Sequence, residues 1–175
     1  MGDSDTKNLE NLVRDFFDAE HVQDFKCSSC KKAGGVFKKS SIWTYPKNLF
    51  LSVSRFKVWP RVMKKKDKVK IPSTKINLTE YKQKFVSQEN LYPYRDMFRG
   101  RPSSLGAYNI VGYVEHWGEI NSGHYIAYCA SKGDGNKWTQ FDDDKTKKIL
   151  DIGMERPFAG GSGEVYIIAL ELATK

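Results

Sequence analysis

The sequence has little of several features that would place it in other classes of protein. No run of apolar residues is long enough to span a bilayer, and the first 20 residues lack the apolar segment of a signal peptide. It has only three cysteines, an odd number that argues against a disulfide framework. We therefore expect no membrane partner and a reducing location, in the cytoplasm, the nucleus or both.

Positive charge exceeds negative charge, with 29 Lys and Arg against 21 Asp and Glu, but it is spread along the chain. The densest cluster is Lys64 to Lys66 with Lys68 and Lys70, which we interpret as the solvated tip of a hairpin. A localisation signal or a phosphate-binding patch is the alternative interpretation. Because aromatic and basic residues do not interleave on one face, the sequence does not indicate a nucleic-acid partner.

The composition suits a packed, strand-rich domain, with 39% hydrophobic and 13% aromatic residues. An N-terminal helix, capped by Asp5 or Thr6, is predicted from apolar residues at helical spacing: Leu9, Leu12, Val13, Phe16 and Phe17. Strands are predicted over residues 36–45, 48–56, 69–71, 108–116, 124–130, 137–141 and 164–172, with a long surface loop at 83–107. The predicted fold class is α+β, mainly antiparallel β.

A histidine and an acidic run stand at the ends of two predicted strands. His124 is near the start of one strand, and Asp142 to Asp144 close the next, across a loop rich in Gly, Asp and Asn. If these strands pair as a hairpin, His124 and an early aspartate lie at neighbouring ends of the sheet. That arrangement is the orienting half of a Cys-His-Asp triad. The alternative is a packing histidine and an acidic run that merely ends a strand.

None of the cysteines fits the role of the attacking thiol. Cys129 follows His124 by five residues in one predicted strand, so it faces the other way, about 16 Å along the strand. We expect it to be a small buried apolar residue. Cys27 and Cys30 have the spacing of two ligands from one zinc knuckle, but zinc needs four and His21 is poorly placed to help. Two free thiols or a disulfide are equal alternatives.

Two ordered segments resemble the histidine box of the ubiquitin-specific protease family. Residues 122–125 read Ser-Gly-His-Tyr, residues 138–143 read Trp-Thr-Gln-Phe-Asp-Asp, and residues 108–118 precede them in the family's order. Upstream, the resemblance extends over the predicted helix, the Cys-x-x-Cys pair, the Pro46-x-x-Leu49 strand and the Arg55-Phe56 strand end.

The resemblance covers roughly residues 9–170 and implies the C-terminal portion of the catalytic domain, without the cysteine box. The whole chain, residues 1–175, would be a single partial domain of the papain-like type. It would hold part of the fingers at about 20–70 and a His/Asp palm at about 108–172.

The resemblance implies a thiol-dependent deubiquitinase that hydrolyses the bond at the C-terminal tail of ubiquitin or a ubiquitin-like protein. His124 would be the base and Asp142 would orient it, with Asp143 as the alternative. The nucleophile would come from the missing N-terminal part, so this chain alone is expected to be inactive. The alternative is a non-catalytic ubiquitin-binding or scaffold module that keeps the fold.

Substrate-binding and metal roles follow from the same resemblance. Gly123 would let a Gly-Gly tail approach closely, and His116 and Tyr125 would line the cleft, although a structural role fits His116 equally well. Catalysis would require no cofactor. A structural zinc would bind Cys27 and Cys30 only if a second cysteine pair came from outside this chain.

Overall fold

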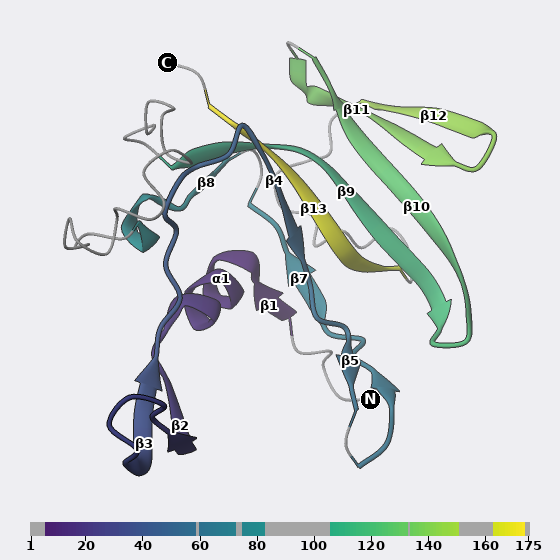
Figure 1. Cartoon of the computed structure of the whole chain (residues 1–175). Coiled ribbons are helices and arrows are strands. Elements are labelled where there is room, and N and C mark those ends of the chain that lie inside the picture. Colours follow the sequence, from purple (N-terminus) through teal and green to yellow (C-terminus); the bar gives the residue numbers. More distant parts are fainter. Residues whose placement is uncertain are drawn as a thin grey trace.

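A seven-stranded antiparallel sheet organises the molecule (Figure 1). The computed structural model describes residues 6–58, 60–72, 75–82, 106–132, 134–150 and 163–173. The strands follow the order β12-β11-β10-β9-β13-β4, and β8 also pairs with β9. They are β4 (Asn48–Ser52), β8 (Lys75–Asn77), β9 (Ala107–Glu119), β10 (Ser122–Ser131), β11 (Asp134–Asp142), β12 (Lys145–Leu150) and β13 (Glu164–Leu172). The predicted class, mainly antiparallel β with one helix near the N-terminus, is confirmed for these ranges.

Shorter elements complete the described chain. They are β1 (Thr6–Asn8), α1 (Leu9–Phe17), β2 (Glu20–Lys26), β3 (Ala33–Lys38), β5 (Phe56–Lys57), β6 (Met63–Lys64), β7 (Lys68–Lys70) and a 3-10 helix (Thr79–Tyr81). Strand β1 pairs in parallel with β7, whereas β2–β3 and β5–β6 are antiparallel hairpins. Strand β12 was not predicted. Of the loop predicted at residues 83–107, residues 83–105 lie outside the described ranges, and Ala107 already belongs to β9.

Helix α1 lies below the sheet and turns one apolar edge towards it (Figure 1). Leu9 and Val13 are buried, one turn apart, while Phe16 remains exposed. The predicted N-caps are wrong, because the helix starts after Asn8 without a side-chain cap bond. Thr6 belongs to β1, so the chain stays extended until the strand pairing ends.

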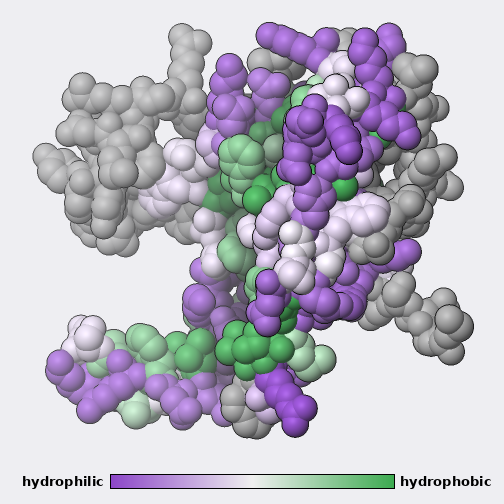
Figure 2. Space-filling model, turned by 90° about the vertical axis from the view of Figure 1, so that its right-hand side faces the viewer, coloured by the Kyte–Doolittle hydropathy of each residue, from purple (hydrophilic) through white to green (hydrophobic). Residues whose placement is uncertain are grey.

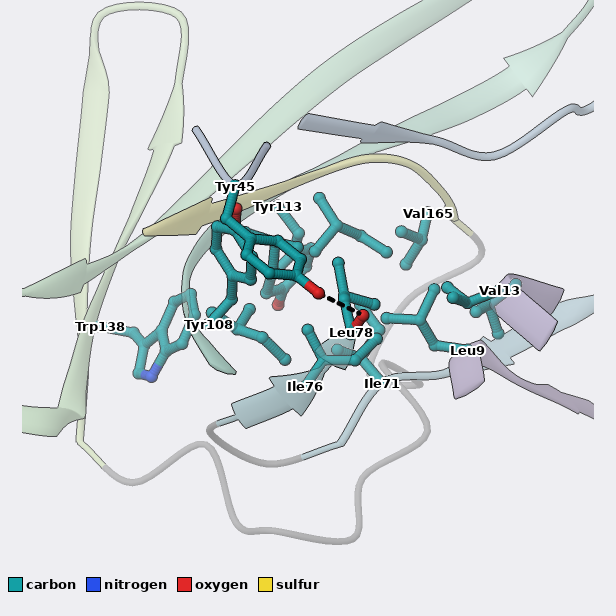
Figure 3. Close-up of a cluster of buried hydrophobic side chains, with 14 residues drawn as sticks. Leu9, Val13, Tyr45, Ile71, Ile76, Leu78, Tyr108, Tyr113, Trp138 and Val165 are labelled. Atoms are coloured by element: carbon teal, nitrogen blue, oxygen red, sulfur yellow. Dashed lines mark hydrogen bonds between the residues drawn. The ribbon is translucent and has the colours of Figure 1, made fainter. Parts of the chain in front are cut away.

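The hydrophobic core lies between α1, the β7–β8 region and one face of the sheet (Figure 3). Tyr108 and Ile168, on adjacent strands β9 and β13, are fully buried. Tyrosine hydroxyls in this core donate to main-chain carbonyls, Tyr45 to Leu78 at 3.3 Å and Tyr108 to Pro46 at 2.9 Å. The Tyr108 bond holds the start of β9 against the segment that precedes β4.

The opposite face of the sheet carries exposed apolar side chains. Phe50, Phe141 and Ile167 are exposed there. Figure 2 shows one side of the molecule, where hydrophobic surface lies between hydrophilic patches. No helix within the described ranges has the length and apolar character needed to cross a membrane.

The β2–β3 hairpin extends away from the sheet (Figure 1). Its turn holds Cys27 and Cys30, and the Lys31 amide donates to the Cys27 carbonyl at 3.0 Å. Lys31 has φ 59°, a left-handed conformation that tightens the turn. The hairpin lies within the region, about residues 20–70, that is predicted to be finger-like. The strand predicted over residues 36–45 is shorter in the structure, because β3 ends at Lys38.

Candidate active site

Two neighbouring strands bring His124 and Asp142 together. The β10–β11 register pairs Ala127 with Phe141, so Asp142 falls diagonally across from His124 on the same face. His124 Nε2 and Asp142 Oδ1 are 2.5 Å apart. The hairpin pairing inferred from the sequence therefore does place the imidazole and an early aspartate in contact. The partner in contact is Asp142 rather than Asp143.

The contact fixes the roles of the two ring nitrogens. A carboxylate can only accept, so Nε2–H donates to Asp142 and Nδ1 is left for another group. The pKa of His124 is raised, first by the hydrogen bond from its ring to Asp142 and further by the charges of Asp142 and Asp143. The side chains are 44% and 37% exposed, so water screens part of this attraction.

Asp143 occupies the tight turn into β12 with φ 51°, a conformation that aspartate tolerates better than most residues. A ring nitrogen of His124 and one carboxylate oxygen each of Asp142 and Asp143 all lie within 4.8 Å of one another, so the three side chains form one compact cluster. Asp143 adds to the negative potential at the imidazole without contacting it as Asp142 does.

Gly123, His116 and Tyr125 also come together, but on the other face of the β9–β10 pair. Register pairs Trp117 with His124 and His116 with Tyr125, so His116 and His124 point in opposite directions. The His116 and Tyr125 ring centroids are 4.7 Å apart. A Cβ added at Gly123 would collide with the His116 ring, so only glycine fits over it. His116 itself is buried.

Lys64 is one buried charged residue that sequence reasoning missed. Its side chain is 1% exposed and its Nζ lies 2.5 Å from Glu164 Oε2. Nζ also lies 2.7 Å from His116 Nδ1 and donates to the Gly118 carbonyl at 2.6 Å. The prediction of a solvated hairpin tip is wrong for Lys64, although Lys65 and Lys66 are exposed. One lysine in a run of lysines carries no pattern that distinguishes it.

Glu115 is a second buried charge missed by sequence reasoning, on the face that carries His124. Trp117 Nε1 donates to Glu115 Oε2 at 3.1 Å. Burial, with a smaller contribution from Glu164, raises the pKa of Glu115 to about 7 against the effect of that hydrogen bond. A carboxyl group in this position changes charge near neutral pH.

Arg55 joins the β5–β7 region to the sheet. It is buried, and it donates through Nε to the Val165 carbonyl at 2.7 Å and through Nη1 to the Asp67 carbonyl at 2.6 Å. These bonds hold the chain that carries Lys64 against the start of β13.

The cysteines lie away from His124. Cys129 is exposed, so the expectation of a buried apolar residue is wrong; it lies on the face of Tyr125 and Ala127, which no described segment covers there. Cys27 and Cys30 are not bonded to each other. Hydrogen bonds from the backbone amides of Cys30 and Ser29 lower the pKa of the Cys27 thiol. Thiolate character is what a zinc ligand requires.

An imidazole–carboxylate pair at the end of an antiparallel sheet is typical of hydrolases that work through a nucleophile and a base. Comparison with known proteins shows which family of hydrolases the chain belongs to. The family model described as Ubiquitin carboxyl-terminal hydrolase matches residues 2–167. The chain belongs to this family.

Individual relatives and structures agree with the family. Ubiquitin carboxyl-terminal hydrolase 8 of Saccharomyces cerevisiae is 30% identical over 152 residues, which make up 83% of this chain and 30% of that protein. Ubiquitin carboxyl-terminal hydrolase 31 of Homo sapiens is 30% identical over 71% of this chain and 10% of its own length. The chain thus spans 30% or less of these relatives.

The fold is shared with solved structures. The structure of the SAGA Ubp8/Sgf11/Sus1/Sgf73 DUB module bound to ubiquitin aldehyde superposes with a TM-score of 0.70 at 23% identity. The similarity covers 97% of this chain and 36% of that one.

Proposed function

We propose that this chain supplies the base and the orienting carboxylate of a thiol-dependent ubiquitin hydrolase, with the nucleophilic cysteine provided from outside residues 1–175. The observation that carries the proposal is the bond between His124 Nε2 and Asp142 Oδ1, which leaves Nδ1 available to a thiol. Membership of the ubiquitin carboxyl-terminal hydrolase family supports it.

In the proposed reaction, His124 Nδ1 takes the proton of the cysteine thiol, and the thiolate attacks the carbonyl carbon at the end of the ubiquitin tail. The imidazolium then returns that proton to the departing lysine amine as the C–N bond breaks. Water, deprotonated by the same nitrogen, attacks the resulting thioester. The C–S bond breaks, the cysteine leaves as a thiolate, and the tail is released as a carboxylate. Asp142 stabilises the imidazolium in both steps, in line with the raised pKa of His124.

The proposed partner is ubiquitin or a ubiquitin-like protein. The SAGA DUB module, solved with ubiquitin aldehyde bound, supports ubiquitin itself. We place the approach of its tail over Gly123, where the His116 ring occupies the space that a side chain would fill, beside the exposed ring of Tyr125. The second proposed partner is the polypeptide that carries the cysteine.

We propose a structural zinc only on the condition that a second pair of cysteines is supplied from outside this chain. Cys27 and Cys30 would provide two thiolates, and the lowered pKa of Cys27 supports this role. Two further ligands would have to come from outside this chain. Catalysis would need no cofactor.

The test uses a fluorogenic ubiquitin conjugate. The chain alone should give no thiol-dependent turnover, and Cys129→Ala should change nothing. With a polypeptide carrying the family's cysteine motif, activity should appear and fall by several orders of magnitude in His124→Ala, as loss of a triad member commonly causes. Asp142→Ala should lose more activity than Asp143→Ala. Equal activity of His124→Ala and the parent would end the catalytic assignment, and ubiquitin binding without turnover would favour a non-catalytic binding module.

A further inference from the structure

Acceptor groups surround Lys64 Nζ. An ammonium group has three N–H donors and no acceptor. Three short contacts surround Nζ: Glu164 Oε2 at 2.5 Å, His116 Nδ1 at 2.7 Å and the Gly118 carbonyl at 2.6 Å. The His116 carbonyl is a longer fourth contact at 3.4 Å. The contact with Glu164 is an ion pair between the ammonium and the carboxylate, not a hydrogen bond.

This geometry determines the tautomer of His116. Because Lys64 can only donate, His116 Nδ1 must offer its lone pair, and the ring proton must sit on Nε2. Burial and the charge of Lys64 lower the pKa of His116, which agrees with a neutral ring. The ring is further fixed by packing against Tyr125 and Tyr166, at centroid distances of 4.7 and 5.8 Å.

The protonated nitrogen faces Gly123. Of the atoms near a Cβ added at Gly123, His116 Nε2 is the nearest. The glycine therefore lets this Nε2–H lie directly against the strand, one residue before His124.

We propose that Lys64 is a positioning residue that holds His116 as an Nε2–H donor for a backbone carbonyl of the substrate tail at Gly123. This rests on the proposed function, because it assumes that an extended peptide lies over that glycine. The lysine acts through His116 and touches neither the substrate nor His124.

Imidazole nitrogen NMR tests the tautomer without any catalysis. The chain has three histidines, so long-range proton–nitrogen spectra of the labelled protein contain three ring systems to assign. In the parent, His116 should show a protonated Nε2 and an unprotonated Nδ1. Lys64→Met should produce a tautomer mixture or a charged ring, while Lys65→Met, which changes an exposed neighbouring lysine, should match the parent.

Two results of this NMR experiment would overturn the proposed tautomer of His116. A proton on Nδ1 in the parent overturns the proposal even if Lys64→Met fails to fold. An unchanged His116 spectrum in a folded Lys64→Met also overturns it.

Titration with ubiquitin tests the proposed contact between His116 Nε2–H and a carbonyl of the substrate tail. The His116 Nε2 proton should shift on binding, and Lys64→Met should bind about five- to tenfold more weakly, the range for one hydrogen bond. Binding without a shift at His116 overturns the carbonyl contact but leaves the proposed function standing. Absence of binding by the parent counts against the proposed function and the carbonyl contact, while the tautomer result stands on its own.

Discussion

Glu115 makes a specific prediction about stability and pH. It is 3% exposed, and its pKa is raised from an ordinary 4.5 to about 7. Between these values the folded protein keeps the proton that the unfolded chain gives up, so the free energy of unfolding falls as pH rises through this window. Below about pH 4.5 the Glu115 carboxyl is protonated in both states, so it costs no stability. Above pH 7 the loss of unfolding free energy is complete, at about 3 kcal/mol as an order of magnitude, because each unit of pKa difference corresponds to about 1.4 kcal/mol.

Glu115→Gln removes this charge while keeping an oxygen that can accept from Trp117 Nε1. At pH 8 the variant should be more stable than the parent by up to about 3 kcal/mol, and near pH 5 the difference should shrink to little or nothing. Burial raises the pKa of the nearby Tyr128 to about 12, so it stays neutral throughout this range. Glu164 is the other acidic group that acts on Glu115.

Urea unfolding at pH 5, 6, 7 and 8 measures the effect, because the difference between variant and parent cancels the titration of every unchanged group. Glu171→Gln, an exposed carboxyl on β13, is the matched control and should show no such trend. A Glu115→Gln difference that stays constant over the range would refute the reasoning, since it would mean that the folded and unfolded carboxyls titrate alike.

Two further predictions concern the sheet. Asp142→Asn should lower the pKa of His124, and Asp143→Asn should lower it less. The hydrogen bond to Asp142 is the largest cause of the raised pKa, and the charge of Asp143 is the smallest. NMR titration of the His124 ring measures both changes. The reverse order would contradict the assignment of Asp142. Ile168→Ala removes a side chain with 0% exposure and should reduce the free energy of urea unfolding by about 2–5 kcal/mol, whereas Ile167→Ala, on the exposed face, should cost clearly less. Equal losses would mean that the second face is covered in solution.

Much of the sheet could be predicted because its strands alternate. The predicted strands at 108–116, 124–130, 137–141 and 164–172 fall within β9, β10, β11 and β13. The pairing of His124 with Asp142 followed from two strand ends and a loop, which are local features. Strand β12 was missed because its Lys-Thr-Lys-Lys start gives no apolar alternation before Ile149.

The buried charges could not be predicted, because their partners are distant in the sequence. Lys64 contacts His116 and Glu164, which lie 52 and 100 residues further along, and no local pattern links them. The exposure of Cys129 was mispredicted for a related reason: the alternation gave its face correctly, but the sequence did not reveal that this face lacks a cover there.

Strand β9 places neighbouring residues of the site on opposite faces of the sheet. Odd-numbered Trp117 accompanies His124 on one face, and even-numbered His116 accompanies Tyr125 on the other. Inserting or deleting a single residue inside the strand would exchange these two sets, because side chains repeat every second residue. Lys64 would then meet an indole in place of an imidazole, and a histidine would stand beside the base. A change of length at the turn, residues 120–121, would instead leave the faces of both strands in place.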